Sequence, residues 1–132
     1  MKTYPIDAIR NVALVGHGST GKTSLGEAML YASGSISRMG RVDDGSSASD
    51  YDQDEVGRQM SINAAILPCE WKKAKINLID TPGYPDFVGD VVGSLRAVEA
   101  ALLVVDGSAT IEVGTETAWD LATQADITKM FF

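Results

Sequence analysis

The sequence predicts a three-layer α/β domain, in which a mostly parallel sheet is covered by helices on both faces. Two observations lead to this fold class. Short apolar runs, typical of buried strands, alternate along the chain with segments whose apolar residues recur at helical spacing. The chain has 132 residues, of which 45% are hydrophobic, and this is enough for one domain with one core.

The first strand and the first helix flank a glycine-rich turn. Residues 11–15, NVALV, form a mostly apolar run that predicts a short buried strand. Residues 22–32 then predict a helix, because apolar side chains return on one face. The apolar residues on that face are Leu25, Ala28, Met29 and Ala32.

Residues 33–59 are rich in glycine, serine and aspartate and contain few apolar residues. We expect a long loop here, and a loop of this length in a compact domain is usually functional or disordered. Its acidic run is expected to form a solvated surface. The acidic residues of this run are Asp43, Asp44, Asp50, Asp52, Asp54 and Glu55.

Two strands are expected after the loop. Residues 61–71 predict one strand, ending or bulging near Pro68, and residues 74–79 predict the next. The short basic turn at Lys72 and Lys73 between them indicates an antiparallel hairpin at one edge of the sheet.

The last third of the chain continues the alternation of helices and strands. A turn with two prolines and a glycine at residues 80–86 precedes a helical stripe over residues 87–98. A buried strand is expected at residues 100–105, a helix at residues 111–125 and a further strand from Ile127.

The turn after the first strand fits two phosphate-binding motifs. Its glycines, Gly16, Gly18 and Gly21, fit G-x-G-x-x-G, which binds dinucleotides. The first and last of these glycines, followed by Lys22 and Thr23, fit G-x-x-x-x-G-K-[ST], the P-loop of nucleoside triphosphate-binding proteins. Both motifs place backbone N–H groups and a helix N-terminus against phosphate.

Residues further along the chain favour the P-loop. A dinucleotide motif needs an acidic residue at the end of a second strand about 20 positions on. Asp43 and Asp44 lie near that distance, but no apolar strand leads into them. A P-loop needs a lysine for the β- and γ-phosphates, a hydroxyl for Mg²⁺ and a distant strand that ends in aspartate. Lys22, Thr23 and Asp80 meet these needs. The expected nucleotide-binding residues are Gly16, His17, Gly18, Ser19, Thr20, Gly21, Lys22, Thr23, Ser24 and Asp80.

At residues 80–87, DTPGYPDF, the sequence resembles the GTPases of protein synthesis, and most of all the N-terminal part of the G domain in the elongation factor G family. The P-loop, GRQMSI at residues 57–62 and VVDG at residues 104–107 are similar to motifs of that family. The resemblance covers nearly the whole chain. It implies binding and hydrolysis of GTP with Mg²⁺, in a conformational switch on the ribosome. It also implies that residues 33–61 form the switch I loop and that the Asp-Thr-Pro-Gly turn forms switch II.

The resemblance also implies roles for single residues. Ser61 stands where the family has a threonine that binds Mg²⁺ together with Thr23, and Asp80 reaches the ion through water. The N–H of Gly83 is expected to hydrogen-bond the γ-phosphate and is added to the nucleotide-binding residues. Tyr84 stands where the family has a histidine that positions the attacking water. The expected catalytic residues are Lys22, Gly83 and Tyr84, and the expected metal-binding residues are Thr23, Ser61 and Asp80.

The departure at Tyr84 predicts slow hydrolysis. A phenol titrates near pH ~10 and carries no positive charge at neutral pH, although it can hydrogen-bond a water molecule. We therefore expect a paralogue of elongation factor G with slow turnover. Two other functions stay open: a P-loop ATPase, and a nucleotide-dependent binding switch that scarcely turns over.

The remaining expectations concern the whole protein. The family's guanine-reading motif, Asn-Lys-x-Asp, does not occur in the chain, so residues 1–132 are expected to form a G domain truncated before completion, with no second domain. The net charge of −7 makes binding to free DNA unexpected. No apolar run approaches the about 20 residues of a membrane span. A single cysteine, Cys69, fits the cytoplasm.

Overall fold

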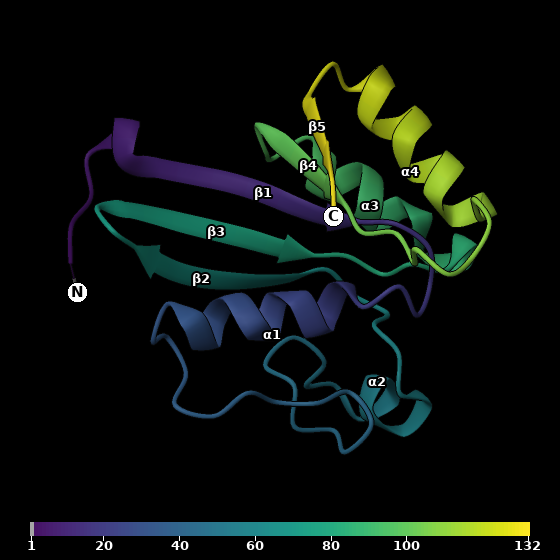
Figure 1. The fold of residues 1–132 in the computed structure, drawn as a ribbon, viewed down its shortest axis with the longest axis horizontal. Helices are drawn as coiled ribbons and strands as arrows, with labels where there is room; N and C mark the ends of the chain where they lie inside the picture. Colours follow the sequence, from purple (N-terminus) through teal and green to yellow (C-terminus); the bar gives the residue numbers. More distant parts are fainter. Residues whose placement is uncertain (1) are drawn as a thin grey trace.

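A computed structural model of the chain describes residues 2–132 and has the expected three-layer architecture (Figure 1). Five strands form one sheet in the order β2-β3-β1-β4-β5. The pair β2 and β3 is antiparallel and the other neighbouring strands are parallel, as predicted. The strands are β1 Ile9–Val15, β2 Ala65–Trp71, β3 Ala74–Asp80, β4 Ala100–Leu103 and β5 Thr128–Phe131.

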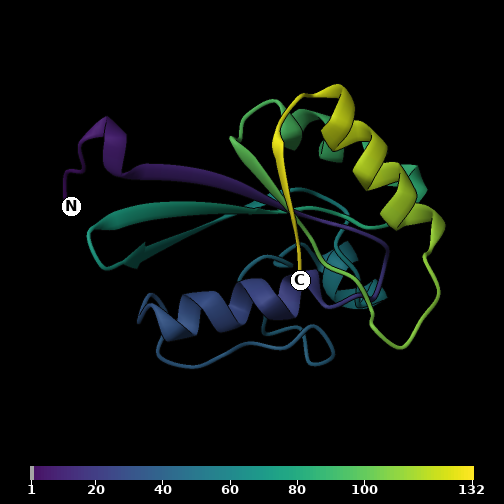
Figure 2. The ribbon, with the colours of Figure 1, turned by 45° about the horizontal axis from the view of Figure 1, so that its top comes forward.

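Helices cover both faces of the sheet. The helix α1 lies on one face, and α3 and α4 lie together on the other (Figure 2). The observed bounds of α1 are those that the sequence predicts. The helices are α1 Lys22–Ala32, α2 Gln53–Arg58, α3 Val88–Leu95 and α4 Val113–Gln124, with 3₁₀ turns η1 Ile6–Ala8 and η2 Pro85–Phe87.

The hydrophobic core is divided by the sheet, and β1 contributes to both halves. Leu14 packs on the α1 side with Leu30 of α1, whereas Ala13 and Val15 pack on the other side with Val91 of α3. This follows from the strand geometry, in which successive side chains point to opposite faces. The central strand is therefore buried on both faces, as its continuous apolar run predicts.

The predicted strand at residues 61–71 is wrong in two respects. It begins only at Ala65, because the preceding N–H groups bond to side chains: those of Ile62 and Asn63 to Glu55, and that of Ala64 to Asp90. The strand also continues through the proline without a bulge, because the pairing register is unbroken along its length. A proline is tolerated there because β2 is an edge strand.

The prediction of a loop throughout residues 33–59 is wrong at α2. Asp52 caps this helix: its side chain accepts the N–H of Asp54, and the Glu55 carboxylate accepts the N–H of Asp52. This reciprocal pattern, an N-cap residue followed three positions later by glutamate, is a helix-start signal. The signal was present in the sequence, within a composition that otherwise indicates a loop.

The three central strands end at the same edge of the sheet. Val15, Asp80 and Leu103 close the parallel strands β1, β3 and β4, and the loops that follow gather beyond them. The order of the strands reverses at β1, and ligands in open α/β sheets bind at such a switch point. No helix within residues 2–132 is long and apolar enough to cross a membrane.

Candidate functional site

The turn between β1 and α1 has the backbone that a phosphate-binding loop requires. Gly16 and Gly21 have φ angles of 141° and 92°, which favour glycine. A Cβ atom on Gly16 would overlap the carbonyl oxygen of Val104, so a side chain is excluded there. Gly21 is the N-cap of α1 and gives the helix no side-chain cap. The first turn of α1 therefore presents N–H groups that an anion can satisfy.

Lys22 points back across this turn. Its Nζ donates to the carbonyl oxygen of Gly16 at 3.1 Å and to that of His17 at 2.5 Å. The side chain is only 6% exposed. Burial lowers the pKa of Lys22 to about 8, against the opposing charges of Asp80 and Glu112. An ammonium has three donors, so one N–H remains for a phosphate oxygen.

Four side-chain oxygen groups converge at the start of α1. The Thr23 hydroxyl donates to Asp80 Oδ2 at 2.6 Å and lies 3.1 Å from the Ser61 hydroxyl. The Ser61 hydroxyl in turn donates to Asp50 Oδ1 at 2.8 Å. The structure therefore brings the three predicted metal-binding residues together and adds Asp50 to them.

The two carboxylates of this group are buried and incompletely bonded. Asp80 and Asp50 are 1% and 2% exposed. Burial raises the pKa of Asp80 to about 6, although the hydrogen bond from Thr23 opposes this shift. Burial likewise raises the pKa of Asp50. Within residues 2–132, Oδ1 of Asp80 and Oδ2 of Asp50 are buried without a hydrogen-bond partner.

The expectation that the whole acidic run is solvated is therefore wrong at Asp50 and Glu55, both of which are 2% exposed. Asp50 also accepts the hydroxyl of Ser49, and its N–H bonds to Ser47. The carboxylate of Glu55, a residue of α2, accepts the N–H of Ile62, which directly follows Ser61. Sequence reasoning missed these two residues because their roles depend on contacts made after the loop folds.

The switch II turn lies directly on the P-loop. A Cβ atom on Gly83 would be 2.5 Å from Lys22 Nζ, 2.6 Å from the Gly18 nitrogen and 2.7 Å from the His17 carbonyl carbon. A Cβ atom on Gly18 would in turn lie 2.8 Å from the Tyr84 ring. The two glycines therefore allow switch II and the P-loop to approach to contact distance. The predicted catalytic residues Lys22, Gly83 and Tyr84 form one group.

A cavity of about 240 Å³ lies between the P-loop, the loop at residues 33–61 and the turn at residues 80–84. The residues that line it are Gly18, Ser19, Gly21, Lys22, Thr23, Ser24, Val42, Asp43, Asp50, Gln59, Met60, Ser61, Thr81, Gly83 and Tyr84. Four predicted site residues do not line the cavity. Three of them, Gly16, His17 and Thr20, belong to the P-loop itself, in which the Thr20 hydroxyl donates to the His17 carbonyl oxygen. The fourth is Asp80, which accepts the hydroxyl of the lining residue Thr23.

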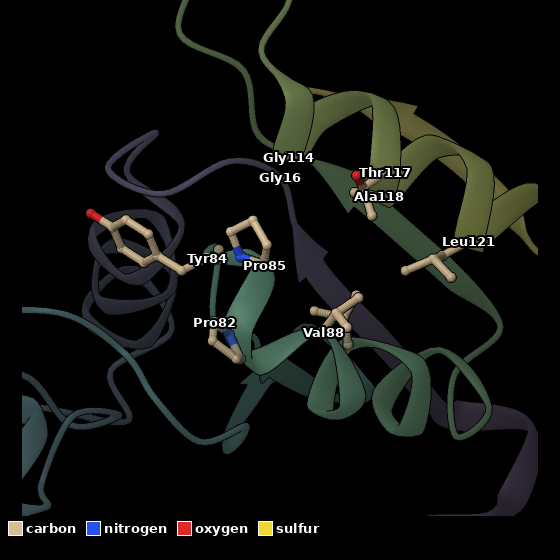
Figure 3. Close-up of a pocket in the computed structure, with 11 residues that line it drawn as sticks. Gly16, Pro82, Tyr84, Pro85, Val88, Gly114, Thr117, Ala118 and Leu121 are labelled. Atoms are coloured by element: carbon tan, nitrogen blue, oxygen red, sulfur yellow. The ribbon is translucent and has the colours of Figure 1, made fainter.

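A smaller pocket opens on the other side of the P-loop, between α3 and α4 (Figure 3). Its volume is about 30 Å³, which is room for little more than water. Figure 3 shows the side chains of Val88 and Leu121 beside this pocket and the Tyr84 ring pointing away from it. The ring of His17 lies toward α4, where its Nδ1 accepts the N–H of Gly114 at 3.3 Å.

The fold and the larger cavity together define a P-loop nucleoside triphosphate-binding domain. Residues 7–132 match the family described as "Elongation factor Tu GTP binding domain". The chain belongs to this family and is a GTP-binding domain of the elongation factor G type. The resemblance found in the sequence is thereby confirmed, and the P-loop ATPase alternative is set aside.

Relatives of known name and structure agree with this assignment. The chain is 41% identical over 132 residues to "Ribosome-releasing factor 2, mitochondrial" of Scheffersomyces stipitis, and 37% identical over 132 residues to "Elongation factor G" of Granulibacter bethesdensis. Each match covers 100% of this chain but only 16% and 19% of those relatives. A crystal structure of a protein from Thermus thermophilus matches with a TM-score of 0.92 and 40% identity, over 94% of this chain and 19% of that one.

A more distant structure supports the fold alone. Translation elongation factor SelB from Methanococcus maripaludis, in complex with the GTP analogue GPPNHP, has a TM-score of 0.69 at 19% identity. That match covers 92% of this chain and 21% of the SelB chain. The three-layer architecture is thus shared well beyond the range of close sequence similarity.

Proposed function

We propose that the cavity between the P-loop and the two switches binds GTP or GDP with Mg²⁺ and hydrolyses GTP slowly. The observation that carries this proposal is the oxygen group around Thr23, with two buried carboxylate oxygens that have no partner within residues 2–132. A buried polar atom without a partner is costly. Water molecules on a cation held by these residues would supply the missing hydrogen bonds to Asp50 and Asp80.

The donor set fits Mg²⁺. The hydroxyls of Thr23 and Ser61 are proposed to bind the ion, with Asp80 and Asp50 holding water molecules around it. Two hydroxyls that bind directly and two carboxylates that act through water suit an ion that keeps several waters and takes further ligands from phosphate. When bound, Mg²⁺ neutralises charge on the β- and γ-phosphates.

The protein's own contribution to hydrolysis is to position the phosphates and stabilise charge on them. Lys22 is held by two carbonyls, so its remaining N–H is oriented before the nucleotide arrives. The N–H groups of the P-loop and the start of α1 surround the phosphates. Gly83, in contact with Lys22, is proposed to donate its N–H to the γ-phosphate and so to report hydrolysis to switch II.

Slow hydrolysis is proposed from Tyr84. The ring lies against Gly18 at the edge of the cavity, where a phenol can hold a water molecule. A phenol side chain is never a cation, so it supplies no positive charge to the transition state. The same residue favours a second candidate function, a nucleotide-dependent binding switch that scarcely turns over. A single-turnover hydrolysis rate equal to that of free GTP would select the second function.

Replacement of Tyr84 by histidine is expected to raise the single-turnover rate of GTP hydrolysis by about tenfold or more, since a well-placed proton-transfer group contributes about 10²–10⁴-fold. The rate is measured with and without ribosomes. Tyr51→His is the matched control, because Tyr51 is 79% exposed on switch I, and it is expected to leave the rate unchanged. An equal rate for Tyr84→His and the parent under both conditions would contradict the proposal that Tyr84 makes GTP hydrolysis slow.

We further propose that residues 1–132 are part of a longer G domain, with switch I at about residues 33–61. Its relatives are more than five times as long. The name of ribosome-releasing factor 2 supports the ribosome as a partner of the whole protein. The single cysteine, Cys69, supports the proposed cytoplasmic compartment.

A further inference from the structure

We infer that Glu27 is a positioning residue that fixes switch I on α1, and that it thereby places Asp50 and Ser61 over Thr23. Switch I denotes residues 33–61. The inference rests on the proposed function in one respect, namely that closed switch I helps to hold the triphosphate. The attachment of the loop by Glu27 stands on the geometry alone.

Glu27 is a buried carboxylate whose two oxygens both bond to switch I. The side chain is 1% exposed, although it lies on a helix next to a polar loop. Its Oε2 accepts the N–H of Gly40 at 2.7 Å, and its Oε1 accepts the N–H of Ala48 at 2.5 Å. A buried charge is tolerated only when it is well bonded, so these two amides account for its position.

The two amides come from a point where the loop folds back on itself. A Cβ atom on Gly40 would overlap the carbonyl oxygen of Ser46 and lie 2.8 Å from the Cα of Ser47. Two segments of the loop therefore pass each other at contact distance, directly over Glu27. One carboxylate joins both passing segments to α1.

The segment that Glu27 holds continues along the chain into the proposed metal site. Ala48 precedes Asp50 by two residues, and Asp50 accepts the hydroxyl of Ser61, which lies 3.1 Å from that of Thr23. Thr23 and Glu27 are four residues apart on α1, so their side chains lie on one face of the helix. Through these contacts switch I is attached to α1 at two places, Thr23 and Glu27. The attachment at Glu27 is the one further from the phosphate-binding turn.

Breaking this connection should loosen the loop and leave the rest of the domain intact. Glu27→Gln keeps the shape of the side chain but replaces one acceptor by an NH₂ donor, which faces an N–H. The closed loop then becomes less populated. Only a ligand that binds the closed loop more tightly than the open loop responds to this change. The triphosphate is such a ligand under the proposed function, and the diphosphate is not.

The first test is hydrogen exchange measured by mass spectrometry on the full-length protein without nucleotide. In Glu27→Gln, peptides within residues 38–50 are expected to exchange about tenfold faster than in the parent, which corresponds to about 1.4 kcal/mol. Peptides from β1 and β3 are expected to be unchanged, which shows that the core is intact. Glu116→Gln, an exposed change on α4, is the matched control. Unchanged exchange in residues 38–50 overturns the inference.

The second test compares nucleotide affinities of the same variants with Mg²⁺. Glu27→Gln is expected to bind a non-hydrolysable GTP analogue about tenfold more weakly and to bind GDP within about twofold of the parent. Equal losses for both nucleotides overturn the link between Glu27 and the triphosphate site. If the parent binds neither nucleotide, the proposed function fails, and the exchange measurement still decides whether Glu27 holds the loop.

Discussion

Replacement of Lys22 by methionine is expected to lower the affinity for GTP by about tenfold to a hundredfold. The ammonium is held by two carbonyl oxygens beneath the cavity, and it is the cation of the P-loop. A hydrogen bond to a charged group contributes about 1.5–3 kcal/mol, and loss of the bond from the one remaining N–H therefore weakens binding by about tenfold to a hundredfold. The measurement is a titration with GTP and Mg²⁺ monitored by calorimetry.

The matched control for this change is Lys73→Met. Lys73 lies in the exposed turn between β2 and β3, so its loss removes the same charge at the opposite end of these strands. It is expected to bind GTP like the parent. GTP affinity in Lys22→Met within about threefold of that in Lys73→Met would mean that Lys22 does not contact the phosphates, since about 0.7 kcal/mol is too little for a charged hydrogen bond.

Replacement of Gly83 by alanine is expected to weaken the binding of a GTP analogue by about tenfold to a hundredfold, with a smaller effect on GDP. The new Cβ would lie 2.6 Å and 2.7 Å from backbone atoms of Gly18 and His17. The P-loop cannot move aside without losing its own shape, and overpacking of this kind costs about 1–3 kcal/mol. Switch II must therefore retract, and its N–H leaves the γ-phosphate. Fluorescence titration with labelled nucleotides measures both affinities.

Gly89→Ala provides the comparison for this second change. Gly89 lies in the first turn of α3, and a Cβ atom there would meet nothing within 4 Å. Alanine favours a helix over glycine by about 1 kcal/mol, so this variant is expected to be as stable as the parent or more so. If Gly83→Ala bound the GTP analogue as tightly as Gly89→Ala, switch II would not contact the γ-phosphate.

The parts of the site that could be predicted from the sequence are those whose residues follow one another at fixed offsets. Gly16, Gly21, Lys22 and Thr23 lie on one turn and one helix start, so their spacing alone predicts their arrangement. Asp80 was found because a P-loop needs a distant apolar strand that ends in aspartate, and residues 76–80 supply one. The sequential alternation of strands and helices followed from the spacing of the apolar segments, whereas the order β2-β3-β1-β4-β5 within the sheet was not predicted.

The parts that sequence reasoning missed depend on contacts between distant segments. Glu27 is not among the apolar residues from which the helix was predicted, and its carboxylate is buried where it accepts two backbone N–H groups of switch I. Asp50 and Glu55 look like members of a solvated acidic run until the loop brings them against Ser61 and Ile62. No periodicity in a loop distinguishes a carboxylate that accepts backbone amides from one that faces water.

The most direct test of the proposed site is a crystal structure of the protein with a non-hydrolysable GTP analogue and Mg²⁺. We predict Lys22 Nζ within about 3.2 Å of a β- or γ-phosphate oxygen. The hydroxyls of Thr23 and Ser61 are predicted at about 2.1 Å from the ion. A nucleotide bound elsewhere, with Lys22 still bonded only to the carbonyls of Gly16 and His17 and no ion beside Thr23, would contradict the proposal.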